Sequence, residues 1–526
     1  MERKISMKIK VITDGLEKEI ECQEKETLLS VMNREEIFMH PACAGKGICG
    51  KCKVRVKKGE VPITKEDQMK FTPLQLQQGF RLACQMFPVK DCIVEMVGRA
   101  KESGAKIITK YIDHKSDGQE ISIIDNTYSI AIDIGTTTLV IALVGNQSKA
   151  VIGEYACTNS QRIFGSDVIA RILAANEGAG SQLQECIRTD ILQGIAHLKA
   201  EANLQKNRID KIVISGNTTM SHILLGYSCQ GLSSYPFSPI ELGRVKKTFV
   251  EVFADDLLVA EVIFFPAISA FVGGDIVSGL YACEFDKNET PCLLIDLGTN
   301  GEMVLGSKKQ IWAASTAAGP AFEGGNITWG MSSLAGAILG MNIIDNIVQI
   351  KTIGNASPLG ICGTGVIETV AELQRVGYIK PEGLLCEPYF TEGFPLAKTA
   401  QGDKIIFTQA DIRELQLAKA AIRAGVETLM KKAKITYDQI KTVYLAGGLG
   451  FSLKPEIAVA IGLLPKELES KIQAVGNSSL GGAIKYATDS QGESRLDKII
   501  ERADEVLLAN AAEFTDLYLE HMFFER

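Results

Sequence analysis

The sequence predicts a multidomain α+β protein, in which a small β-sheet domain with a cysteine-rich loop precedes a larger α/β region made of two similar halves. Three observations predict this organisation. Three cysteines lie close together on a glycine-rich loop that ends at residue 52. An apolar strand that ends in an aspartate and a glycine turn occurs twice, 163 residues apart, at Asp133 and Asp296. A third glycine motif follows at Gly447.

The loop HPACAGKGICGKC carries Cys43, Cys49 and Cys52, and Cys84 follows after 31 further residues. Four thiolates in this three-plus-one arrangement can hold a [2Fe-2S] cluster, because two irons need four terminal sulfur ligands and a loop must wrap around the inorganic core. Glycines suit such wrapping because they adopt positive φ freely; the loop has Gly45, Gly47 and Gly50. The alternatives are plain buried thiols or a zinc site, which usually pairs its cysteines as Cys-x2-Cys twice.

The segments around the loop predict a small β-sheet. Residues 7–22 alternate in polarity about an Asp-Gly pair, which is typical of a tight hairpin. A short helix precedes the loop, and residues 51–60 and 92–97 are predicted strands. Hairpin, helix, cysteine loop and two strands together resemble a β-grasp [2Fe-2S] ferredoxin over residues 1–98, with a first cysteine gap similar to the adrenodoxin-like branch.

The composition is that of an ordinary globular protein, with 46% hydrophobic and 23% charged residues. A net charge of −7, with no block of basic residues, argues against nucleic acid as a partner. No apolar run in the sequence reaches the roughly 18 residues that a membrane span requires, and the sequence therefore predicts a cytoplasmic protein. The nine cysteines outside the cluster set of the 13 are expected to be buried free thiols.

Residues 99–126 are rich in charge and glycine and have no sustained period, so they are predicted to form a linker that lets the cluster domain move. The alternative is a docked segment, because residues 107–112 contain apolar side chains that could pack. The larger region then begins at residue 127.

A carboxylate followed by a glycine turn occurs in residues 127–145 around Asp133 and again in residues 292–306 around Asp296. Such a turn can hold a hydrated Mg²⁺ and offer backbone N–H and hydroxyl donors to a polyphosphate. The turn residues are Gly135, Thr136, Thr137 and Thr138 in the first copy, and Gly298, Thr299, Asn300 and Gly301 in the second. One copy could be a simple hairpin, but two copies indicate a duplicated fold.

The third motif is VYLAGGLG, residues 443–450, in which small residues after a buried strand let an adenosine lie against the backbone. Its glycines are Gly447, Gly448 and Gly450. With this motif, residues 127–526 resemble the ASKHA superfamily, which includes the acetate and sugar kinases, Hsp70 and actin. The resemblance implies two ribonuclease-H-like lobes, at about 127–290 and 291–526, that close over ATP.

Three other stretches fit this arrangement. In residues 211–220 a strand is followed by Asn217 and Thr218, which either cap a helix or face the cleft. Residues 411–433 have apolar side chains at helical spacing and predict a core helix beside the nucleotide site. Asp167 stands at the start of a predicted helix and is a candidate N-cap.

The order of the domains, together with the stretches GNTTMSHILLG, AGPAFEGGNI and QADIRELQLAKAAIRAG, resembles the RACo-type reductive activators of corrinoid proteins. The resemblance implies that the protein reduces the Co(II) form of a corrinoid protein to Co(I) through a [2Fe-2S] cluster, with ATP and Mg²⁺, and so reactivates a corrinoid-dependent methyltransferase. It also implies an external low-potential electron donor and a homodimer formed through the ASKHA domain. Larger members carry a middle domain after the linker, which this sequence is expected to lack because the linker runs almost directly into Tyr128.

Two other functions remain open: an ASKHA small-molecule kinase with a redox-sensing cluster, and an ATP-coupled electron donor to another low-potential enzyme. A carrier needs ATP only when electron transfer is uphill, and a deficit of about 0.1 V, or about 2.3 kcal/mol, lies within the usual coupling between two sites. In the ATP-dependent reading, Asp133 and Asp296 are expected to position Mg²⁺ and the attacking water. Thr136 to Thr138 and Thr299 are expected to hold the γ-phosphate oxygens.

Overall fold

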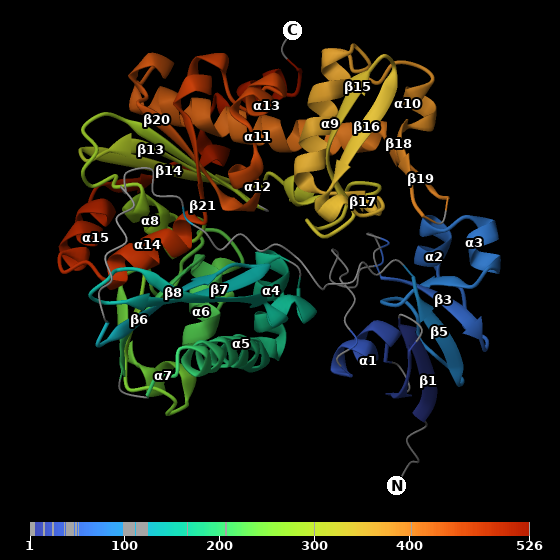
Figure 1. Ribbon diagram of the computed structural model, residues 1–526, viewed down its shortest axis with the longest axis horizontal. Coiled ribbons are helices and arrows are strands. Elements are labelled where there is room, and N and C mark those ends of the chain that lie inside the picture. Colours follow the sequence, from blue (N-terminus) through green and yellow to red (C-terminus); the bar gives the residue numbers. More distant parts are fainter. Residues whose placement is uncertain are drawn as a thin grey trace. The chain divides into compact units, whose positions relative to one another are not determined.

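The computed structural model describes residues 6–13, 16–23, 26–35, 37, 47, 50, 52–97, 111, 125–165, 167–205, 208–298, 300–400 and 402–524. The chain divides into two compact units, an N-terminal unit of residues 1–103 with 161–171, and a larger unit of residues 104–160 with 172–526 (Figure 1). Across the described part of the chain, no helix combines the length and apolar character that crossing a membrane requires.

The N-terminal unit is built on one mixed sheet. Its strands are β1 (Ser6–Thr13), β2 (Leu16–Gln23), β3 (Lys53–Lys58), β4 (Phe80–Leu82) and β5 (Cys92–Met96), in the order β2-β1-β5-β3-β4. Its helices are α1 (Leu28–Arg34), α2 (Lys65–Lys70) and α3 (Pro73–Gln77). The predicted hairpin forms, with Thr13 paired to Leu16, and its two turn residues lie outside the described residues. Because β1 also runs parallel to β5, the sheet has the predicted β-grasp character.

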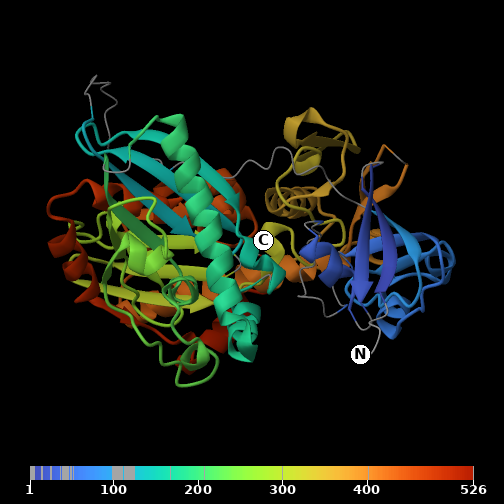
Figure 2. The same cartoon turned by 90° about the horizontal axis from the view of Figure 1, so that it is seen from below.

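The first half of the larger region, residues 127–290, contains β6 (Tyr128–Ile134), β7 (Thr138–Gly145), β8 (Val151–Thr158), β9 (Ile209–Gly216), β10 (Val245–Thr248) and β11 (Glu261–Phe264). They form a sheet in the order β10-β11-β9-β6-β7-β8. The helices in this stretch are α4 (Val168–Ala174), α5 (Gly180–Glu201), α6 (Thr218–Leu225), α7 (Phe249–Phe253) and α8 (Gly274–Ala282). Figure 2 shows α5 lying across the strands of this sheet. Asp167 accepts a hydrogen bond of 2.8 Å from the Ala170 N–H, so it caps α4 as predicted.

The second half, residues 291–526, repeats this topology. Its main sheet contains β12 (Cys292–Leu297), β13 (Gly301–Ser307), β14 (Gln310–Thr316), β20 (Thr442–Ala446), β21 (Ile472–Gly476) and β22 (Ala503–Glu505), in the order β21-β20-β12-β13-β14-β22. In each half three consecutive strands are antiparallel, and the first of them lies parallel to a later strand, which is β9 in one sheet and β20 in the other. The duplication predicted from the two aspartate-glycine turns is therefore confirmed.

The second half also carries elements between β14 and β20. These are β15 (Ala337–Ile344), β16 (Ile347–Thr352), β17 (Gly360–Ile361), α9 (Gly363–Arg375), α10 (Tyr389–Glu392), β18 (Phe394–Lys398), β19 (Lys404–Phe407) and α11 (Gln409–Ala433). Helix α11 begins two residues before the predicted start because Thr408 caps it and forms a capping box with Asp411. A Cβ on Gly301 would overlap Ile422 of this helix, so α11 lies against the second glycine turn as expected. The chain continues with α12 (Gly447–Ser452), α13 (Pro455–Ala460), α14 (Ser478–Ala487), α15 (Gly492–Ile500) and α16 (Phe514–Glu520).

Helices α8 and α14 join the two halves (Figure 1). They follow β11 and β21, which occupy corresponding positions in the two sheets, so the pair is itself a product of the duplication. Two positions between them have no room for a side chain: a Cβ on Gly279 would lie 2.8 Å from the Ser478 Oγ, and one on Gly482 would overlap the Ser278 carbonyl. The Ser278 hydroxyl donates to the Ser479 carbonyl over 2.6 Å. In such closely packed helices, a small displacement of one helix is expected to displace the other.

Candidate functional site

The N-terminal unit brings two of the predicted cluster ligands together. Cys52 and Cys84 are buried, and the Cys52 thiol donates a hydrogen bond to the Cys84 sulfur over 3.2 Å. Two sulfurs bound at about 2.3 Å to one tetrahedral metal ion are roughly 3.8 Å apart, so this pair needs only a small adjustment to share an iron. The other two predicted ligands, Cys43 and Cys49, lie outside the described residues.

Glycines shape the backbone beside this thiol pair. Gly47 has a φ of +76° and Gly50 a φ of +69°, the left-handed conformation predicted for the loop, while Gly45 lies outside the described residues. A Cβ on Gly47 would lie 2.8 Å from the Glu66 Cγ, so the loop passes close to α2 at this point. The Gly47 backbone also lies within hydrogen-bonding reach of the Cys84 sulfur.

The same contacts lower the pKa of the Cys84 thiol. The hydrogen bond from Cys52, helped by the Gln85 side chain and the Gly47 backbone, lowers the pKa of Cys84 to about 7 against the opposing effect of burial. By contrast, burial raises the pKa of Cys92, in the same unit, to about 11. A metal binds the thiolate rather than the thiol, so a thiol that ionises near neutral pH is suited to a cluster and Cys92 is not. The described residues thus fit a [2Fe-2S] cluster.

In the larger unit, four half-buried carboxylates from four different elements gather in one region. Asp133 lies near the end of β6 and Asp275 in the first turn of α8. Asp296 lies near the end of β12, and Glu302 of β13 is its direct cross-strand partner. The two aspartates predicted from the sequence are therefore brought together, and two further carboxylates join them.

These carboxylates are crowded enough to change one another's acidity. Burial, with repulsion from Asp133, raises the pKa of Asp275 to about 7. Burial, with repulsion from Asp275 and Asp133, raises the pKa of Asp296 to about 7, and burial first of all holds the pKa of Glu302 well above its usual range. Like charges that share a site either take up protons or bind a cation. An all-oxygen site of this charge fits a hydrated Mg²⁺.

Asp133 is held by two donors from the opposite half of the molecule. The Asn477 amide donates to one carboxylate oxygen over 2.8 Å, and the Ser479 hydroxyl donates to the other over 2.7 Å. Asn477 also caps α14, because its Oδ1 accepts the Leu480 N–H over 2.8 Å. Burial raises the pKa of Asp133, and these two hydrogen bonds oppose the rise. Both oxygens of the carboxylate therefore have fixed directions.

The first glycine turn is closed by its own backbone and by a buried asparagine. The Gly135 N–H donates to the Thr138 carbonyl over 2.9 Å. The Asn159 side-chain amide donates to the Gly135 carbonyl over 2.9 Å, and the Asn159 backbone N–H donates to the Thr137 carbonyl over 3.0 Å. In the second turn the Gly298 N–H donates to the Asn300 carbonyl over 3.1 Å, and Thr299 lies outside the described residues.

The third glycine motif borders the carboxylates directly. Gly447 has a φ of +82°, and a Cβ there would lie 2.7 Å from the Asp296 Oδ1. No described atom lies within 4 Å of a Cβ placed on Gly448, so open space begins at that residue. Gly450 packs back on β20, since its Cβ would lie 3.0 Å from the Leu445 carbonyl carbon.

Asn217 caps α6, as one of its two sequence-based interpretations predicts, and it also contacts the first glycine turn. Its Oδ1 accepts the Met220 N–H over 2.9 Å, so it caps α6, and its Nδ2 donates to the Thr136 hydroxyl over 3.2 Å. The cap of this helix therefore also positions a side chain of the first glycine turn.

Sequence reasoning missed several of these residues, although signals for some were present. Glu302 is the one charge within the apolar strand GEMVLG, and a charge in a buried strand is informative. Asn477 and Ser479 belong to the string Gly-Asn-Ser-Ser, which resembles the Gly-Asn-Thr-Thr string that begins at Gly216. For Asn159, which reaches the turn from beyond β8, we find no comparable signal.

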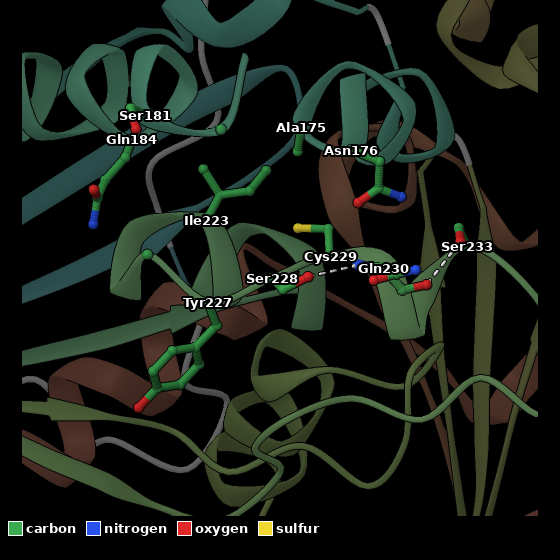
Figure 3. Close-up of a pocket in the computed structure, with 12 residues that line it drawn as sticks. Ala175, Asn176, Ser181, Gln184, Ile223, Tyr227, Ser228, Cys229, Gln230 and Ser233 are labelled. Carbon is green, nitrogen blue, oxygen red and sulfur yellow. Dashed lines mark hydrogen bonds between the residues drawn. The ribbon is translucent and has the colours of Figure 1, made fainter. Parts of the chain in front are cut away.

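A separate cavity of about 660 Å³ lies between the start of α5 and the segment after α6 (Figure 3). Ser181 and Gln184 line it from α5, and Ser228 and Gln230 line it from the facing segment. The described residues around it carry no charge, so it suits neither a polyphosphate nor a divalent cation. The chemistry of the carboxylate region is therefore not shared by this cavity.

Three family models match the chain in order. A 2Fe-2S iron-sulfur cluster binding domain matches residues 11–89, the RACo middle region matches residues 128–288, and the C-terminal domain of RACo, the ASKHA domain, matches residues 290–526. The expectation that a middle domain is missing is therefore wrong. The middle region itself begins with the strand and glycine turn around Asp133, which is why the sequence alone did not separate it from the first lobe.

Similar proteins agree with these matches. The "Corrinoid activation enzyme RamQ" of Eubacterium limosum is 31% identical over 422 residues, which is 76% of this chain and 70% of that relative. The Co(II) methylated amine-specific corrinoid protein reductase of Methanosarcina barkeri is 26% identical over 429 residues, 74% of this chain and 76% of that relative. A solved structure, "Reductive activator for corrinoid,iron-sulfur protein", matches with a TM-score of 0.67 and 28% identity over 98% of each chain.

Proposed function

This chain belongs to the RACo family, and we propose that it reduces the Co(II) form of a corrinoid protein to Co(I) in an ATP-dependent, one-electron reaction. The names of its relatives support this function. The observation that carries it is the presence, in one chain, of a buried thiol pair suited to a [2Fe-2S] cluster and of a four-carboxylate region elsewhere. A simple electron carrier would need only the thiols. Reduction to Co(I) reactivates the corrinoid protein for a methyltransferase.

We propose that Cys43, Cys49, Cys52 and Cys84 hold the cluster, which supplies one-electron transfer when bound. The burial of the Cys52 and Cys84 pair excludes water from its surroundings. An external low-potential donor provides each electron, and the Co(II) corrinoid accepts it.

MgATP binds at the carboxylate region in this proposal. Asp133 and Asp296 would hold the hydrated Mg²⁺ and orient the attacking water, and Asp275 and Glu302 would add negative charge around the ion. The fixed orientation of Asp133 between its two donors supports its role, because a carboxylate that binds metal-bound water must point in a defined direction.

The glycine motifs complete the nucleotide site. The hydroxyls and the remaining backbone N–H groups of the two turns, residues 135–138 and 298–301, would contact the phosphates, since the N–H groups of Gly135 and Gly298 already donate within their turns. The adenosine lies along Gly447, Gly448 and Gly450, and the open space beside Gly448 supports this placement. The nucleotide would then touch both halves of the larger region.

The decisive experiment mixes cluster-loaded protein, a strong reductant and a Co(II) corrinoid protein, with and without MgATP, and follows the cobalt by optical and EPR spectroscopy. Co(I) is expected to appear only when MgATP is present. Equal conversion without nucleotide would contradict the coupling of ATP to electron transfer.

Two further assays separate the competing functions. A kinase would phosphorylate small hydroxyl or carboxyl acceptors, so no transfer of the γ-phosphate to such acceptors is expected. A general electron donor would hydrolyse ATP regardless of its partner, whereas Co(II) corrinoid protein is expected to stimulate ATP hydrolysis here.

The protein is proposed to act in the cytoplasm as a homodimer formed through the ASKHA domain, which the family model matches at residues 290–526, in keeping with its family resemblance. Sedimentation of the full chain, and of a variant with charged residues placed on that half, measures the dimer directly. A monomer at micromolar concentration would contradict it.

A further inference from the structure

Tyr111 belongs to the predicted linker, yet it is packed into the larger unit. Its backbone forms an antiparallel bridge with Gly476, the last residue of β21. Its hydroxyl donates to the carbonyl of Ala282, the last residue of α8, over 3.0 Å. The side chain is half-buried against the core that the two halves share. At this residue the docked alternative to a free linker is therefore the better description.

The surface under the tyrosine ring is shaped to receive it. A Cβ on Gly481 of α14 would overlap the ring, so the ring lies directly on the helix backbone. The Lys485 ammonium stands 5.1 Å from the ring centroid, within the range of a cation–π contact. Lys485 also donates to the Ala282 carbonyl over 3.0 Å, the same acceptor that Tyr111 uses. We call Ala282, Gly476, Gly481 and Lys485 the Tyr111 seat.

The Tyr111 seat and the carboxylate region are built on the same two helices. Helix α8 carries Asp275 in its first turn and ends at Ala282, a distance of about 10 Å along the helix axis. In the other helix, Gly476 directly precedes Asn477, one of the two donors that hold Asp133. Because α8 and α14 are closely packed, a displacement of the helices at one end of the pair is expected to displace them at the other end.

We propose that Tyr111 is a positioning residue that links nucleotide binding to the tether of the iron–sulfur domain. The Tyr111 seat takes Ala282 from the first half and its other members from the second. The hydrogen bonds to Asp133 also join the two halves, and a nucleotide bound between Asp133 and Gly447 would join them as well. All three contacts favour one arrangement of the halves, so nucleotide binding and the seating of Tyr111 stabilise each other. The inference rests on the proposed function in one respect, the binding of MgATP at the carboxylate region.

Seating changes the length of the tether. With Tyr111 seated, 13 residues, 98–110, separate Val97 of the N-terminal unit from the anchor. With Tyr111 released, 27 residues, 98–124, separate Val97 from Asp125. At about 3.3–3.6 Å per residue the greatest span falls from about 90–97 Å to about 43–47 Å. A shorter tether raises the effective concentration of the iron–sulfur domain near the larger unit.

The test uses the cluster-loaded full chain and trypsin, which cuts after Lys110 and Lys115 on either side of Tyr111. A nonhydrolysable MgATP analogue is expected to slow cleavage at these lysines at least about fivefold in the unchanged protein, within the range of ordinary site-to-site coupling. In Tyr111→Ala the analogue should leave cleavage unchanged and bind with a Kd raised by a similar factor. Gly481→Ala should reproduce both effects because its methyl group displaces the ring.

Matched controls separate the seat from general effects of substitution. Tyr235→Ala removes a tyrosine that is 80% exposed, and Gly180→Ala adds a methyl group whose nearest neighbour would be 3.7 Å away. Both should behave as the unchanged protein does. Tyr111→Phe keeps the ring on Gly481 and loses only the bond to Ala282, so a smaller change of the same sign is expected. The optical spectrum of the cluster and the Tm verify that each variant is folded.

Two results would overturn the proposal in distinguishable ways. If the unchanged protein binds the analogue normally but cleavage and Kd are the same in Tyr111→Ala, Tyr111→Phe and the unchanged protein, the linkage is wrong and the proposed function stands. If the unchanged protein binds no nucleotide at all, the proposed function itself fails, and the linkage fails with it.

Discussion

The thiol pair of the N-terminal unit and the carboxylates of the larger unit are both suited to a metal centre, but their acidities are changed in opposite directions. Hydrogen bonding from Cys52 lowers the pKa of Cys84 to about 7, whereas burial and crowding raise the pKa of Asp275 and Asp296 to about 7. The Cys84 thiol is thus prepared for ionisation before a metal binds, while the carboxylates repel one another until a cation neutralises part of their charge. The first site is suited to a permanent cofactor, and the second to a ligand that comes and goes.

The largest effect is expected from Cys84→Ser, which removes one of the two described cluster thiols. It should abolish the optical and EPR signals of the cluster and all corrinoid reduction, while nucleotide binding persists. Cys49→Ser should do the same, since it removes another predicted ligand. Cys92→Ser is the matched control, because burial raises the pKa of that thiol to about 11 and it should not bind iron. Loss of nucleotide binding along with the cluster would indicate misfolding instead.

Asp133→Ala removes one of the four carboxylates of the larger unit. Without the residue proposed to hold metal-bound water, ATP turnover should fall by about 10²–10³-fold, as for the loss of a preorganised electrostatic group at a reaction centre. The spectrum of the cluster should not change. The exposed Asp403 offers a control, and Asp403→Ala should turn over ATP normally. Undiminished turnover in Asp133→Ala would remove this carboxylate from the nucleotide site.

Ser479→Ala sharpens the comparison by removing one donor that opposes the effect of burial on Asp133. The pKa of Asp133 should rise, so the acidic limb of the pH profile of ATP turnover should move to higher pH. Loss of a hydrogen bond to a charged group, about 1.5 kcal/mol, predicts an affinity for MgATP about tenfold weaker at pH 7. Ser181→Ala, in the uncharged cavity, provides the control. An unshifted profile would show that this donor does not set the acidity of Asp133.

The smallest effect concerns stability and pH. Raised pKa values mean that the folded protein without Mg²⁺ holds more protons than the unfolded chain between about pH 4 and pH 7, so its free energy of unfolding falls as the pH rises through this window. Mg²⁺ should therefore raise the Tm by about 2–4 °C more at pH 8 than at pH 6. Differential scanning fluorimetry measures both shifts, and Asp296→Asn should reduce the difference between them. Equal shifts at the two pH values would argue against a cation among these carboxylates.

The sequence predicted those parts of the fold and site that depend on short strings. No more than 25 consecutive residues specify each of the hairpin of β1 and β2, the two aspartate-glycine turns and helix α11. In these stretches the local pattern of polarity and glycine decides the backbone. Whether the two aspartates contribute to one site followed only from the resemblance, and their mutual effect on pKa now supports it.

The remaining site residues depend on how distant segments meet. Glu302 joins the carboxylates because the turn at residues 298–301 sets it directly opposite Asp296. Asp275 and the donors Asn477 and Ser479 arrive on helices that follow corresponding strands of the two sheets, so only the tertiary fold brings them to Asp133. The contact of Tyr111 with the larger unit could not be predicted from the sequence either. It requires helix backbone without a side chain at Gly481, more than 350 positions further along the chain.

The glycine contact between α8 and α14 divides each helix into two arms of similar length. Gly279 lies four residues after Asp275 and three before Ala282, and Gly482 lies three residues after Ser479 and three before Lys485. Because each of these glycines lies against a serine of the other helix, a displacement at the carboxylate end of the pair is expected to be passed on to the end that holds Tyr111.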